Sequence, residues 1–134
     1  MTGISYELIK GGKYGRLLAD EFYQTAITGY RVSYDRNAMR CDLYPDGLLV
    51  VYANSEWDFG TFAIDTPAMV VASLEHDAFC NMTNARMLPW SARMKADKNF
   101  WNRLTEHGAT ISRFWRVPGV MLYSQLVARW KDRA

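Results

Sequence analysis

Three side chains of this sequence have the types and the spacing that acid–base chemistry needs. His76 and Asp77 are adjacent, and Asp97 follows later in the chain. A carboxylate behind an imidazole fixes the tautomer of the ring and stabilises the ring when it takes a proton. We therefore expect Asp97 to orient His76, and His76 to act as the base that activates a water molecule.

Asp77 is expected to serve a different purpose from its neighbour. Successive residues of a helix are rotated by about 100°, so Asp77 points away from the direction of His76. The Asp77 carboxylate would then lie beside the acidic loop that contains Asp58, and the carboxylates of Asp77 and Asp58 would repel each other unless a cation lay between them. Carboxylates and loop carbonyls are ligands that suit a hard cation such as calcium.

Two helices must position these side chains. Thr66 is a suitable N-cap and Pro67 a suitable first residue for a helix that carries His76 and ends before Pro89. Ser91 is a suitable cap for the next helix, which carries Asp97. A further amphipathic segment over 111–130 predicts a third helix.

Asp97 occupies an unusual place in the second of these helices. It lies within a stripe at i, i+3, i+4 spacing that otherwise holds Met94, Phe100, Trp101 and Leu104. A carboxylate in such a stripe loses its hydration, which costs several kcal/mol unless the group is hydrogen-bonded or paired. The sequence therefore predicts a partner for Asp97, and His76 is the natural one. The alternative is that the pair serves only to satisfy polar groups in the core.

The N-terminal half has the pattern of strands. The segment 22–33 is rich in aromatic and β-branched residues. The apolar runs 39–44 and 48–52 flank Pro45, Asp46 and Gly47, which predicts a β-hairpin because proline presets φ and glycine accepts positive φ.

Together these elements predict a single α+β domain over 1–134. Residues 1–66 are expected to be mainly strands and loops, and residues 67–131 to be helical, with the helices packed on a small antiparallel sheet.

The composition excludes several classes. The chain has 49% apolar and 14% aromatic residues and a net charge of +2, which is typical of a folded domain and argues against a nucleic-acid partner. Its apolar runs are too short for a transmembrane segment. The two cysteines, Cys41 and Cys80, form no disulfide framework, and we expect both to be small buried hydrophobic residues.

Several motifs occur in the order seen in a family of small uncharacterised tailed-phage proteins. That family typically has Trp-Asp-Gly, then Ile-Asp-Thr, then Ser-Leu-x-His-Asp-Ala-Leu, then Ala-Asp-x-x-Phe. The sequence resembles it over roughly residues 57–127, through Ile64-Asp65-Thr66, Ser73-Leu74-Glu75-His76-Asp77-Ala78 and Ala96-Asp97-Lys98-Asn99-Phe100. The resemblance implies a phage protein found in the host cytoplasm or the virion.

The same layout resembles compact bacterial phospholipases A2. These enzymes have a calcium loop, a His-Asp helix and an Asp on the following helix. The resemblance implies that His76 is the general base and Asp97 its orienter. It also implies that Asp77 and Asp58 bind calcium, with loop carbonyls near Phe59 and Gly60, and that the substrate is a lipid or another acyl ester.

Phe59 departs from both patterns, which favour glycine at that position. Two hypotheses follow. In the first, the chain is a phospholipase-A2-like ester hydrolase. In the second, it is a non-catalytic phage protein, a particle component or a partner of a host protein, in which His76, Asp77 and Asp97 form a buried polar network.

Overall fold

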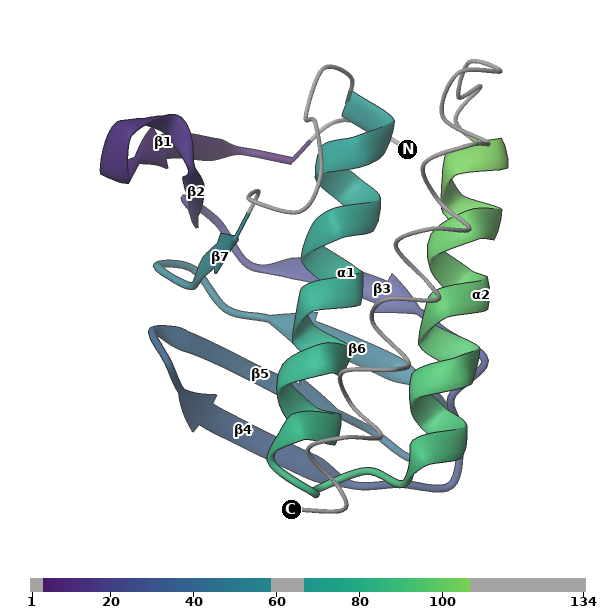
Figure 1. Cartoon of the computed structure of the whole chain (residues 1–134). Coiled ribbons are helices and arrows are strands. Elements are labelled where there is room, and N and C mark those ends of the chain that lie inside the picture. Colours follow the sequence, from purple (N-terminus) through teal and green to yellow (C-terminus); the bar gives the residue numbers. More distant parts are fainter. Residues whose placement is uncertain (1–3, 59–66, 107–134) are drawn as a thin grey trace.

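The computed structural model (Figure 1) describes residues 4–58 and 67–106, and in these ranges the strands, with one short 3-10 helix (η1, Lys10–Gly12) after the first of them, precede two α-helices. A three-stranded antiparallel sheet has the order β1-β2-β7, and a four-stranded one has the order β3-β6-β5-β4. The strands are β1 (Tyr6–Ile9), β2 (Tyr14–Leu17), β3 (Glu21–Gln24), β4 (Val32–Arg36), β5 (Met39–Leu43), β6 (Leu48–Val51) and β7 (Glu56–Asp58).

The β5–β6 hairpin confirms the prediction made from the Pro-Asp-Gly signal. β5 and β6 pair antiparallel, with Leu43 opposite Leu49. Gly47 has φ +90° in the connecting turn, and the Asp46 carboxylate accepts a hydrogen bond from the backbone N–H of Leu48 at 3.1 Å. Glycine is favoured there because other residues rarely adopt a positive φ.

Two helices follow the strands, and they run antiparallel side by side (Figure 1). α1 covers Pro67–Asn84 and α2 covers Trp90–Glu106. Pro67 is the first residue of α1, as predicted, whereas the expected cap Thr66 lies outside the described residues. The prediction for Ser91 is wrong: α2 already begins at Trp90, directly after Pro89, so Ser91 lies inside the first turn.

The core lies between the helix pair and one face of the four-stranded sheet. Its largest fully buried side chains include Tyr34, Leu49, Phe79 and Phe100. Tyr23 is 2% exposed, and its hydroxyl donates a hydrogen bond to the Val71 carbonyl of α1 at 2.8 Å. This bond joins the sheet to the helix and pairs the buried hydroxyl.

Three members of the predicted stripe, Met94, Asp97 and Phe100, have side chains that the structure describes, and Met94 departs from the prediction. Met94 is 48% exposed, while Arg93, Ala96, Asp97 and Phe100 are buried. These four buried positions recur at i, i+3, i+4 and i+7, as on one face of a helix, with Arg93 in place of Met94 on that face. The helix thus buries two charged residues.

The α+β class is confirmed for the part of the chain that the structure describes, with antiparallel sheets first and helices after. The third predicted helix falls outside the described residues. Neither α1 nor α2 is long and apolar enough to cross a membrane.

Candidate functional site

The centre of the candidate site is a hydrogen bond between the two helices. His76 Nε2 lies 2.6 Å from Asp97 Oδ1, and the two side chains are 4% and 0% exposed. His76 is near the middle of α1 and Asp97 near the middle of α2, so the antiparallel packing of the helices brings them together. The structure therefore places this pair in direct contact, as expected from the apolar surroundings of Asp97.

Arg93 is a second buried cation beside Asp97. Its Nε lies 4.0 Å from Asp97 Oδ1, one helical turn away, and its NH1 group donates to Thr83 Oγ1 at 3.1 Å. The Thr83 hydroxyl in turn donates to the Phe79 carbonyl. The charge of Asp97 is thus compensated even when His76 is neutral. The i, i+4 spacing of Arg93 and Asp97 was the sequence signal for this contact.

Cys80 lies on the other side of the imidazole. Its Sγ is 3.5 Å from His76 Nδ1 and 3.9 Å from Nε2. Because the two distances are similar, the sulfur lies beside the ring rather than in line with one nitrogen. The expectation that both cysteines are buried hydrophobic residues holds for Cys41 alone, since Cys80 is only partly buried and touches a polar ring.

These neighbours determine the charge state of His76. Burial by itself lowers the pKa of the imidazole, but the charges and hydrogen bonds of Cys80 and Asp97 outweigh burial and raise the pKa to about 10. These contacts favour the protonated imidazole, paired with the Asp97 carboxylate, over the neutral ring that a general base requires.

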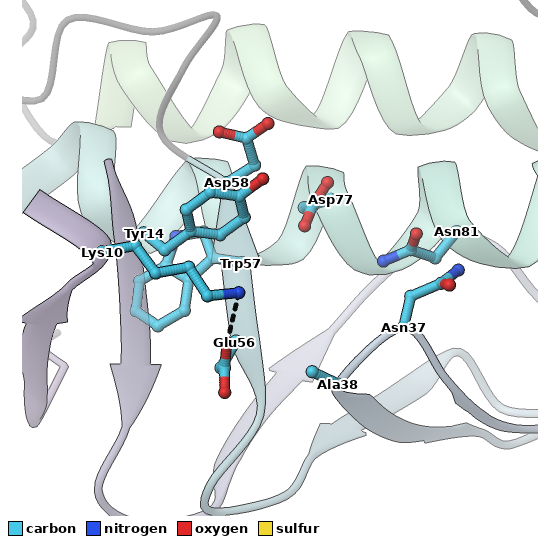
Figure 2. A pocket seen from close by; sticks show the side chains of 9 residues that line it. All are labelled: Lys10, Tyr14, Asn37, Ala38, Glu56, Trp57, Asp58, Asp77 and Asn81. Carbon is cyan, nitrogen blue, oxygen red and sulfur yellow. Dashed lines mark ion pairs between the residues drawn. The ribbon is translucent and has the colours of Figure 1, made fainter. Parts of the chain in front are cut away.

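Asp77 faces a different part of the molecule. Figure 2 shows Asp77 and Asn81 projecting from α1 into a pocket, opposite Asp58 of β7 and Asn37 of the β4–β5 turn. The pocket has a volume of about 580 Å³, and its lining is mostly polar; Lys10, Tyr14, Ala38, Glu56 and Trp57 complete it. Lys10 and Glu56 form an ion pair across one wall, with Nζ 3.2 Å from Oε1 (Figure 2).

Two contacts bring Asp58 close to Asp77. The buried indole N–H of Trp57 donates to Ser73 Oγ at 3.1 Å, which ties β7 to α1 one turn before Asp77. The backbone N–H of Asp58 is hydrogen-bonded to the Asp77 carboxylate. Burial raises the pKa of Asp77 to about 6, and the Asp58 charge acts in the same direction, against the positive charges of His76 and Arg93.

The two aspartates are the part of the expected calcium site that the structure describes. Phe59 and Gly60, whose carbonyls were expected to complete it, lie outside the described residues. Within 4–58 and 67–106, no group of three or more His, Cys, Asp or Glu side chains could hold a metal ion. Two carboxylates with Asn81 nearby are hard oxygen donors, so their chemistry suits calcium better than a soft metal.

The candidate site therefore has two halves that face in different directions. His76 faces α2 and is not among the residues that line the pocket, whereas Asp77 faces β7 and is. Sequence reasoning identified the members of both halves but missed Arg93 and the role of Cys80.

Comparison of the chain with protein-family models, with curated proteins and with solved structures gives no match in any of the three. A function for this chain must therefore be inferred from the contacts of its own side chains.

Proposed function

We propose that this chain is a non-catalytic protein in which His76, Asp97 and Arg93 form a structural clamp between α1 and α2. The observation that carries the proposal is that all three side chains are buried and that His76 and Arg93 both lie against the Asp97 carboxylate. A general base must be neutral and must reach its substrate, whereas Asp97 favours the protonated form of His76 and the His76 side chain is only 4% exposed.

In this proposal the molecule works by binding a partner, and the resemblance to phage proteins indicates a phage particle or a host protein as the class of partner. The clamp fixes the helix pair and, through Ser73 and Trp57, the position of β7 beside it. It thereby holds the polar pocket around Asp58 and Asp77 in one shape.

A second candidate is a phospholipase-A2-like ester hydrolase. One observation favours it: Asp97 holds His76 at Nε2, so a base and its orienter are assembled, and the adjacent Asp77 faces the Asp58 carboxylate of β7 across the pocket. In this candidate His76 activates water, and calcium at Asp58 and Asp77 polarises the ester carbonyl. Since only the neutral imidazole accepts a proton, the rate would rise with pH towards 10.

One set of measurements separates the two. Hydrolysis of p-nitrophenyl esters and of a short-chain phospholipid is followed from pH 7 to 10, with and without calcium, in the wild type and in His76→Asn. We expect no turnover that depends on His76 at any pH. Turnover that rises with pH and disappears in His76→Asn would overturn the structural proposal.

Calcium binding is tested separately by calorimetry. Asp77→Asn is the test variant, and Asp35→Asn, an exposed aspartate of β4, is the matched control. Heat of binding that disappears in Asp77→Asn but persists in Asp35→Asn assigns the cation to the pocket. The absence of any heat in the wild type rejects the calcium part of the hydrolase candidate.

A further inference from the structure

Cys80, His76 and Asp97 form a contiguous set of a thiol, an imidazole and a carboxylate. Reactive cysteines share this combination, in which a nucleophile touches a base or cation that a third group orients. Here Cys80 Sγ is 3.5 Å from His76 Nδ1, and Asp97 Oδ1 is 2.6 Å from Nε2, the other nitrogen of the same ring. The function proposed above uses Cys80 only as a neighbour of the His76 ring and assigns no reaction to the thiol.

We propose that Cys80 is a reactive thiol, activated by the neighbouring His76, and that small electrophiles, hydroperoxides in particular, are its reactants. The proposal goes beyond the function proposed above and does not depend on it. It concerns a covalent reaction at sulfur and needs neither the pocket nor a bound metal.

Electrostatics is the physical basis of the activation. A thiolate is stabilised by a positive charge beside it, and the thiolate is the nucleophilic form of cysteine. The charged groups near the sulfur include His76 and Asp77 on its own helix and, behind the ring, Asp97 and Arg93 from α2. His76 is the cation in contact with the sulfur, at 3.5 Å from Nδ1, so a protonated ring would stabilise a thiolate at Cys80 directly.

Accessibility distinguishes Cys80 from the other cysteine. Cys80 is partly exposed, whereas Cys41 of β5 is fully buried, and burial raises the pKa of the Cys41 thiol to about 12. Partial exposure admits a small reagent and restricts a large one. Cys41 therefore serves as an internal control that reacts only if the fold opens.

The reaction with a hydroperoxide balances as follows. The Cys80 thiolate attacks one peroxide oxygen, an S–O bond forms and the O–O bond breaks. Sulfur is oxidised to a sulfenic acid, the peroxide is reduced, and the leaving hydroxide or alkoxide takes a proton to become water or an alcohol.

The first experiment uses the wild-type protein and iodoacetamide. The rate of alkylation at each cysteine is measured by peptide mass spectrometry at neutral pH, with glutathione as the reference thiol. We expect Cys80 to be alkylated at least tenfold faster than glutathione, and Cys41 to stay unmodified. A Cys80 rate no higher than that of glutathione would overturn the proposal.

The second experiment removes the activating ring. In His76→Asn we expect the rate of Cys80 alkylation at neutral pH to fall at least tenfold, with Cys41 still unmodified. If His76→Asn unfolds, which alkylation of Cys41 at neutral pH would reveal, Asp97→Asn replaces it and the wild-type rate still decides. An unchanged rate in a folded variant would contradict activation by His76.

The third experiment identifies the product. Hydrogen peroxide at neutral pH, followed by dimedone, is expected to give one adduct on Cys80 in the wild type and none in Cys80→Ser. Rapid alkylation of Cys80 without any dimedone adduct would reject hydroperoxides as the reactant class and leave an alkylation-prone thiol.

Discussion

Asp97 is fully buried, and two cationic side chains depend on its charge. His76 lies at hydrogen-bond distance and Arg93 at 4.0 Å. Removal of one partner from a buried ion pair costs more than the pair itself contributes, because the remaining charges are left without compensation in a poorly polarisable environment.

Asp97→Asn therefore tests the clamp. We expect it to lower the free energy of unfolding by about 3 kcal/mol, measured by urea denaturation at pH 7. Lys98→Ala, at an exposed position of the same helix, is the control and is expected to change stability by less than about 0.5 kcal/mol. Equal stability of the two variants would mean that the contacts of Asp97 do not hold the helices together.

At the scale of secondary structure, local signals were sufficient for the β5–β6 hairpin and for the start of α1, but not for β1, β2 and β7. The hairpin depends on three consecutive residues, Pro45, Asp46 and Gly47, whose backbone preferences act within the turn itself. Pro67 likewise marks a helix start by its own geometry. Such features can be predicted from sequence because no distant residue is needed to produce them.

The start of α2 and the neighbours of His76 were harder to predict. Ser91 and Pro89 both signal a helix start, and the chain uses the earlier position. Arg93 and Cys80 are each one turn from a predicted site residue, but their role depends on the contact between α1 and α2. The sequence spacing alone cannot distinguish such a contact from exposure to solvent.

The β5–β6 turn offers a prediction at this scale. A Cβ atom at Gly47 would lie 2.2 Å from the Thr25 backbone carbonyl oxygen, and Gly47 has φ +90°. Gly47→Ala should therefore lower the free energy of unfolding by roughly 3 kcal/mol, from backbone strain at Gly47 and displacement of the Thr25 carbonyl. Gly11→Ala is the control, because Gly11 also has positive φ but has open space around it. Similar losses in both variants, measured by thermal unfolding, would show that φ alone matters.

Across the whole molecule, the two shifted groups of the site act on stability in the same direction. The pKa of Asp77 is raised from 3.8 to about 6 and that of His76 from 6.5 to about 10. In both cases the folded state holds a proton that the unfolded state has released. The folded state is therefore favoured at low pH, and stability is lost as the pH rises through each interval.

The contribution of Asp77 to the free energy of unfolding is roughly 3 kcal/mol, and it is lost as the pH rises from roughly 4 to roughly 6. For His76 the contribution is complete below pH 6.5 and disappears as the pH approaches 10. We expect the free energy of unfolding, measured in urea at pH 6.5, 8 and 9.5, to fall steadily in the wild type. Asp97→Asn removes a cause of the His76 shift, so its stability should depend less on pH over this range. If the free energy of unfolding falls equally with pH in the wild type and in Asp97→Asn, the group that loses its proton over this range is not His76. The His76–Asp97 ion pair would then be no part of the clamp, because an imidazole that releases its proton near pH 6.5 has no charge to hold Asp97 at neutral pH.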